Sequence, residues 1–202
     1  MAPFGKYCTM NENHKKSVAT IAFWMLLILF MSIIGSSIMT FSYKKKIIKL
    51  GDVGVRAVGV VVTDNNGRPL DKLKFKEPKT GLKPATGELD EITKVPHTIS
   101  AEVGSEGAYA KFYITSEQGY KIYLSNISID GGEDSRKEIY AHLKEDKQNE
   151  SVSFAQDEIL LYTSPEPSNN MEYVLLVWLS QFTSDDMIGS TITFNLKVVP
   201  IS

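Results

Sequence analysis

The sequence predicts a mainly β protein, an antiparallel β-sandwich of the jelly-roll or Ig-like kind, preceded by one N-terminal transmembrane helix. Three observations lead to this prediction. Short runs rich in valine, isoleucine and aromatic residues recur after residue 52, with turn residues between them, which is typical of a sandwich. No long helical pattern alternates with these runs, so a parallel α/β sheet is disfavoured. One apolar run without charged residues precedes them.

The apolar run lies between Lys16 and Lys44. A helix rises about 1.5 Å per residue and needs about 20 residues to cross the hydrocarbon core, so residues 17–43 are long enough to span a membrane. A cleaved signal peptide has an apolar region of about 7 to 15 residues, followed by a small-x-small site. The small residues at 35–37 (GSS) make a poor site of this kind. We therefore favour a retained signal-anchor over a cleaved signal peptide.

These patterns divide the chain into four parts. Residues 1–16 form a polar tail, 17–43 the transmembrane signal-anchor, 44–52 a basic juxtamembrane linker and 53–202 the β-sandwich domain. The lysines of the linker are interpreted as membrane-flanking residues that contact lipid headgroups. They are Lys44, Lys45, Lys46 and Lys49.

Two observations disagree about the side of the membrane on which the sandwich lies. Under the positive-inside rule, the lysines after the anchor would hold that flank in the cytoplasm. Long domains, however, translocate largely regardless of local charge. Cys8 is the only cysteine of the chain, and a β-rich domain without cysteine suits a bacterial surface, although it is also compatible with the cytosol. We expect a single-pass protein of the cell membrane whose C-terminal domain is extracytoplasmic.

The first expected strand is Val53–Thr63 (VGVRAVGVVVT), in which apolar residues nearly alternate. The sequence DNNG at 64–67 follows as a turn, because Asn and Gly tolerate positive φ. The segment Gly67–Glu91 contains three prolines, which discourage both helix and central strand. We expect it to be a loop with at most one short edge strand, Lys72–Lys76.

The middle of the chain alternates more clearly. Strands are expected at His97–Val103 (HTISAEV), Ala108–Thr115 (AYAKFYIT) and Tyr120–Ile129 (YKIYLSNISI). The alternation in the third of these changes phase near Ser125, which predicts a β-bulge. Arg136–Lys144 (RKEIYAHLK) fits a strand or one or two helical turns, and a strand is slightly favoured.

The last part of the chain completes about eight expected strands. Ser151–Tyr162 (SVSFAQDEILLY) offers two short strands, and Ser164–Asn170 is expected to be a loop. Tyr173–Leu179 (YVLLVWL) is apolar at every position, which predicts a central strand covered on both faces. Trp178 within it is our candidate for the centre of the core. Thr191–Val199 (TITFNLKVV) alternates and closes the chain.

The sequence contains no local motif for catalysis or for a cofactor. HExxH, P-loop, GxGxxG and GxSxG patterns do not occur. His97 and His142 are expected to be surface residues on strands rather than ligands. We therefore expect a protein that is not an enzyme and uses no cofactor, and we assign no catalytic residue. The net charge of −2 gives no electrostatic case for nucleic acid, which usually needs a basic face.

Two binding features remain open in the sequence. The loop at 130–134 (DGGED) places the carboxylates of Asp130, Glu133 and Asp134 together, and calcium prefers oxygen ligands of this kind. The alternative is a solvated turn, because the spacing is not that of an EF-hand. Aromatic residues on the expected strands could likewise form a sugar-binding face, although core packing is their commoner use. These are Tyr109, Phe112, Tyr113, Tyr120, Tyr123, Tyr173, Trp178 and Phe194.

Two stretches carry a resemblance to a known family. They are GAYAKFYITSEQGYKIYLSNISI at 107–129 and VWLSQFTSDDMIGSTITFNLKVV at 177–199. The first resembles the sheet-forming middle, and the second the closing hairpin, of the TasA/camelysin-like secreted bacterial surface (biofilm-matrix) proteins. Members of that family act in surface fibres whose subunits are joined by strand exchange. This chain differs from them in its poor cleavage site and in the lysines after its apolar run.

The resemblance and the architecture together imply a non-enzymatic, membrane-anchored surface protein with a structural or adhesive role. Such a protein would pair exposed sheet edges with a protein partner or with another copy of itself. The segment Gly67–Glu91 is a candidate for contact or exchange. The alternative is an extracellular ligand-binding module for a glycan or calcium.

Overall fold

The computed structural model describes residues 23–29, 47–102, 104–130, 133–144, 149–184 and 187–201. The chain divides into two compact units, Met1–Lys45 and Lys46–Ser202. Residues 23–29 of the first unit are helical. The rest of the expected anchor lies outside the described residues, as do Lys44, Lys45 and Lys46. No helix within the described ranges is both long enough and apolar enough to cross a membrane.

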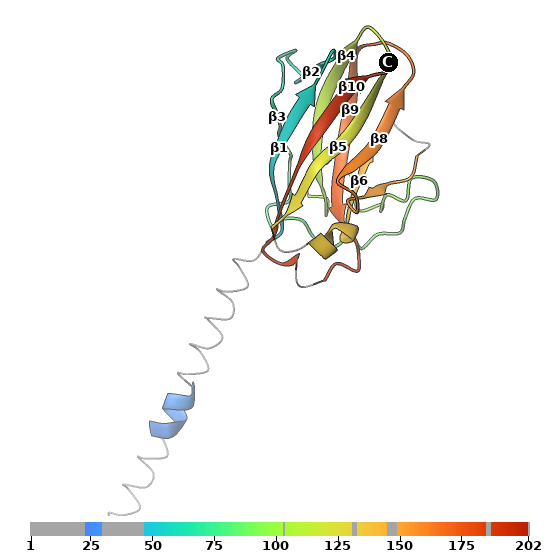
Figure 1. Ribbon diagram of the computed structural model, residues 1–202. Coiled ribbons are helices and arrows are strands. Elements are labelled where there is room, and N and C mark those ends of the chain that lie inside the picture. Colours follow the sequence, from blue (N-terminus) through green and yellow to red (C-terminus); the bar gives the residue numbers. More distant parts are fainter. Residues whose placement is uncertain are drawn as a thin grey trace, which may run out of the picture. The chain divides into compact units, whose positions relative to one another are not determined.

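The second unit is a β-sandwich of two five-stranded sheets (Figure 1). One sheet has the strand order β3-β1-β10-β5-β8, and the other β2-β4-β9-β6-β7. The strands are β1 (Lys49–Ala57), β2 (Val61–Thr63), β3 (Lys72–Leu73), β4 (Ala108–Ser116), β5 (Tyr120–Ile129), β6 (Ile139–Leu143), β7 (Val152–Ser153), β8 (Glu158–Ser164), β9 (Ser168–Leu179) and β10 (Thr191–Pro200). The expected mainly β sandwich is therefore confirmed. The β1–β10 pair is parallel, which departs from the expected antiparallel pattern.

The clearly alternating stretches form the strands that were predicted from them. β4, β5 and β10 match their expected ranges to within one residue at each end. The bulge expected near Ser125 is also present. Ser125 pairs with Asn195 and Ser128 with Thr193, so β5 holds one extra residue there. Asn126 takes a positive φ of 51° at this point, which accounts for the change of phase.

The stretch Val53–Thr63 is not one strand, and that prediction was wrong. The chain turns at Gly59, whose φ of 66° is positive, so β1 and β2 lie in different sheets. Glycine adopts this conformation at no steric cost. The strand also begins earlier than expected, because Lys49 and the rest of the predicted linker up to residue 52 belong to β1.

Three further segments differ from expectation. The described part of His97–Val103 is a loop rather than a strand, and its alternation reflects the burial of Ile99 against a neighbouring sheet. Arg136–Lys144 contains both expected structures, the helical turn and the strand, because the 3₁₀ helix η1 (Glu133–Glu138) is followed by β6. The expected loop Ser164–Asn170 is shorter than predicted, since β9 already begins at Ser168.

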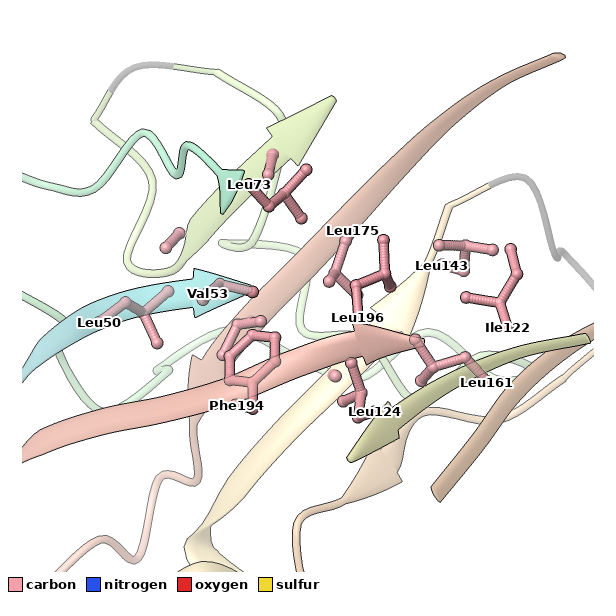
Figure 2. Close-up of a cluster of buried hydrophobic side chains, with 14 of the residues drawn as sticks. Leu50, Val53, Leu73, Ile122, Leu124, Leu143, Leu161, Leu175, Phe194 and Leu196 are labelled. Carbon is pink, nitrogen blue, oxygen red and sulfur yellow. The ribbon is translucent and has the colours of Figure 1, made fainter. Parts of the chain in front are cut away.

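The main core lies between the two sheets. Figure 2 shows Leu124 and Leu196 of one sheet in the same cluster as Leu175 and Leu143 of the other. Phe194 is almost fully buried in this layer. This inter-sheet layer supplies the hydrophobic free energy that holds the sandwich together.

A second, smaller cluster covers the outer face of the β2-β4-β9-β6-β7 sheet. It includes Ile99, Tyr109, Leu176 and Trp178. The expectation that Tyr173–Leu179 is a central strand buried on both faces is therefore confirmed. Trp178 is buried, but it lies in this outer cluster, so its prediction as the centre of the main core was wrong.

Gly81 closes the end of the sandwich at which β1 begins. Its φ is +77°, and a Cβ there would lie 2.6 Å from the carbonyl oxygen of Ile48. Gly81→Ala is expected to lower the free energy of unfolding by about 2–4 kcal/mol, from backbone strain and the clash together. Gly67→Ala is the matched control, because Gly67 has a φ of +74° but no atom within 4 Å of the added Cβ. Urea denaturation should give a smaller loss for the control, and equal losses would contradict the contact with Ile48.

Candidate functional site

The outer edges of the two sheets are the first candidate for an interaction site. An unpaired edge strand exposes backbone N–H and C=O groups that can pair with another chain. Four described strands lie at edges: β3 and β8 in one sheet, and β2 and β7 in the other. β3 and β7 have two residues each and β2 has three, whereas β8 has seven. β8 is therefore the long edge among the described strands.

The segment Gly67–Glu91 covers the edge of β1 beside and beyond the short strand β3. The Val55 N–H donates to the carbonyl oxygen of Asp71 at 2.8 Å, and the Leu50 N–H donates to Glu77 Oε1 at 3.2 Å. Burial raises the pKa of Glu77, and the Leu50 N–H partly offsets this effect. Exchange of a partner strand at this edge would first have to break these hydrogen bonds.

The edge strand β8 carries both buried and exposed apolar side chains, and it contains a bulge. Ile159 and Leu161 are buried against the core, while Leu160 faces outward and is 46% exposed. Ile122 pairs with Tyr162 and Tyr123 pairs with Leu160, so Leu161 is the extra residue of a bulge. A bulge twists an edge and limits straight pairing. A partner strand would therefore pair with β8 on one side of Leu161 or bend with it.

A groove on the outer face of the other sheet is the second candidate site. Its volume is about 330 Å³. Tyr140 and Trp178 stack in its lining, with ring centroids 6.0 Å apart and an interplanar angle of 19°. Leu89 and Phe182 also line the groove and are 55% and 80% exposed. Lys94, Glu150, Ser151, Ser180 and Gln181 add polar groups to the lining.

The hairpin that carries Leu89 is fixed by a carboxylate. Asp90 Oδ1 accepts hydrogen bonds from the backbone N–H and the hydroxyl of Thr93 at 2.8 and 2.9 Å. These bonds lower the pKa of Asp90. Their contribution is therefore present above the ordinary pKa of aspartate and is lost as the pH falls through the lowered value. The Ser151 N–H donates to the Thr93 carbonyl oxygen at 2.7 Å, which anchors the hairpin beside β7.

The structure describes only some of the residues considered for metal binding. No group of three His, Cys, Asp or Glu side chains within the described ranges could hold a metal ion. The side chains of Glu133 and Asp134 are not among those that the structure describes, so a calcium site in the loop at 130–134 stays a prediction. His97 is exposed, but it lies on a loop. His142 is buried in β6, so its prediction as a surface residue was wrong.

Most of the aromatic residues proposed for a sugar-binding face lie in a core instead. Phe112, Tyr120, Tyr173 and Phe194 are buried between the sheets. Tyr120 and Tyr173 form a hydrogen bond between their hydroxyl groups, whose oxygens are 2.5 Å apart. Phe182, which the sequence patterns did not single out, is the exposed aromatic residue at the groove. Phe182 differs from the other aromatic residues in its exposure to solvent, which the sequence does not reveal.

No protein-family model matches the chain, and no curated protein sequence matches it. The fold and its edges define the second unit as a two-sheet β-sandwich with one long edge strand and an aromatic groove. The resemblance to the TasA/camelysin-like proteins stays a prediction.

Proposed function

We propose that this chain is a non-enzymatic protein of the cell surface, anchored by one N-terminal helix, with a structural or adhesive role. Its sandwich lies outside the cell and joins a protein partner or another copy by strand pairing. The observation that carries this proposal is the seven-residue edge strand β8, beside edges that are short or covered by hydrogen-bonded segments. Strand addition at such an edge uses backbone hydrogen bonds and needs no catalytic group.

Within the sandwich class, we propose a jelly-roll-like arrangement. The inner order β1-β10-β5-β8 faces β4-β9-β6-β7, and the chain crosses between the sheets after every strand from β1 to β9 except β6. Such crossings are typical of double-sheet Greek-key folds.

Self-association through β8 gives a direct test. A lysine on an edge strand opposes pairing, because its charge would have to be buried against the incoming strand. Leu160→Lys places one there, and Met171→Lys is the matched control on β9 of the other sheet, since both residues are 46% exposed. The fragment Lys46–Ser202, a compact unit with its own core, is expected to form oligomers in sedimentation velocity. Leu160→Lys should abolish them and Met171→Lys should not.

Two results would contradict the proposal. The first is a wild-type fragment that stays monomeric and captures no partner from the cell surface. The second is a Leu160→Lys fragment that associates as strongly as the Met171→Lys control.

Ligand binding is the second candidate function, and the groove at Trp178 favours it. An exposed aromatic ring beside carboxylate, amide and hydroxyl groups is suited to a saccharide, and the volume of about 330 Å³ falls in the range of small-ligand sites. A saccharide that binds the folded state must raise the melting temperature. Thermal denaturation with a saccharide panel, and separately with calcium, tests this function. An unchanged melting temperature in both cases would remove it.

A further inference from the structure

The sandwich begins at one end, beside the loop that joins β9 to β10. The Lys49 N–H donates to the carbonyl oxygen of Ser190 at 3.2 Å. Ile47 and Ile48 line a cavity of about 210 Å³ together with Ile188 of that loop. In Figure 1 this is the end at which β1 begins and β9 ends. The described part of the β9–β10 loop therefore flanks the point where the chain enters the domain.

This loop exposes apolar side chains to solvent. Phe182 is 80% exposed, more than any other large hydrophobic residue in the described ranges, and Ile188 is 39% exposed. The backbone beside Phe182 is held in place. The Phe182 N–H donates to the Ser180 hydroxyl oxygen at 3.2 Å, and the Thr183 N–H donates to the Ser180 carbonyl oxygen at 3.1 Å. The turn thus presents Phe182 outward from a fixed backbone.

The length of the chain before Ile47 limits what can lie opposite this end. The predicted anchor ends at residue 43, so the backbone makes four residue steps to Ile47. Four extended residues span at most about 14 Å. The headgroup layer on each side of the hydrocarbon core is about 5–8 Å thick. If residues 17–43 cross the bilayer, Ile47 and the loop beside it lie within reach of the lipid headgroups.

We propose that Phe182 and Ile188 of the β9–β10 loop form a second membrane contact by inserting into the lipid headgroup region next to the anchor. This inference rests on the proposed membrane anchoring. Burial of an exposed aromatic ring at the membrane interface is favourable, because the ring leaves water. The same loop carries Asp185 and Asp186 in the sequence, and the linker before Ile47 carries Lys44, Lys45 and Lys46, so the charges beside this contact are mixed and the matching surface is a zwitterionic lipid. Together, the anchor and this contact orient the sandwich on the membrane.

The test uses the full chain in phosphatidylcholine nanodiscs. Cys8 is the only cysteine, so Cys8→Ser allows a single environment-sensitive fluorophore at Phe182→Cys. Met171→Cys is the matched control, because Met171 is exposed and lies eight residues before Leu179 on β9, about 26 Å away along the strand. Gln181→Cys provides a second position in the loop. The melting temperature of each labelled chain verifies its fold.

We expect the probe at residue 182 to show blue-shifted emission, and to lose intensity when the nanodisc contains lipids spin-labelled near the headgroup. The probe at residue 171 should show neither change. Co-purification with the nanodisc but equal responses at the two positions would overturn the loop contact alone. A chain that does not co-purify with nanodiscs would overturn the anchoring, and the loop contact with it.

Discussion

Replacing Phe194 by alanine is expected to lower the free energy of unfolding of the sandwich by about 3–5 kcal/mol. Phe194 is buried between the sheets. Its ring meets Phe154 edge-on with centroids 5.3 Å apart, and Phe75 with centroids 5.9 Å apart. Truncation therefore removes contacts with both neighbours and leaves a cavity between rigid sheets. Urea denaturation followed by circular dichroism measures the loss.

Phe182→Ala is the matched control for this prediction, because it makes the same chemical change at a side chain that is 80% exposed. It is expected to change the free energy of unfolding by no more than about 0.5 kcal/mol. Similar losses for the two variants would contradict the inter-sheet core described here.

Alkaline conditions are expected to destabilise the sandwich through Tyr173. Burial, and next its hydrogen bond with Tyr120, raises the pKa of Tyr173 far above its ordinary value. The folded state thus keeps this proton when the unfolded chain releases it. Because the folded pKa is the higher one, this contribution is fully present below about pH 10, the ordinary tyrosine pKa, and falls as the pH rises further. The urea midpoint should decrease from about pH 8 to about pH 11.

Tyr173→Phe separates this effect from general alkaline unfolding. Near neutral pH the variant should lose about 1–3 kcal/mol, because the Tyr120 hydroxyl loses its partner at 2.5 Å. The gap between wild type and variant should narrow as the pH rises above the ordinary tyrosine value, since the variant no longer carries this buried proton. A gap that stays constant up to about pH 11 would show that Tyr173 is not the responsible group.

The strands could be predicted wherever burial on one face imposes a period of two. β4, β5 and β10 lie within a sheet, and their alternation identified them. The same rule failed at Gly59, where one glycine moves the chain to the other sheet without interrupting the apolar pattern. It failed again at residues 97–102, which alternate because Ile99 is buried while its neighbours on an irregular backbone are not.

The candidate sites were less accessible to sequence reasoning. Whether β8 is an edge depends on which strands pair beside it, and this information is not local to Glu158–Ser164. The groove at Trp178 combines residues from a hairpin, two strands and two loops that lie far apart in the chain. The exposure of Phe182 could not be predicted, because the sequence around a loop phenylalanine does not distinguish an exposed ring from a buried one.

The proposed function requires that the β-sandwich lies outside the cell, beyond a membrane anchor. Translation of the full chain with microsomes is a direct test of this location. The sequence contains acceptor sites for glycosylation at Asn126 and Asn149, and both residues are exposed. We expect a fragment protected from added protease until detergent is present, carrying a glycan that Asn126→Gln and Asn149→Gln together remove. A sandwich that is unglycosylated and digested without detergent would rule out the extracytoplasmic location.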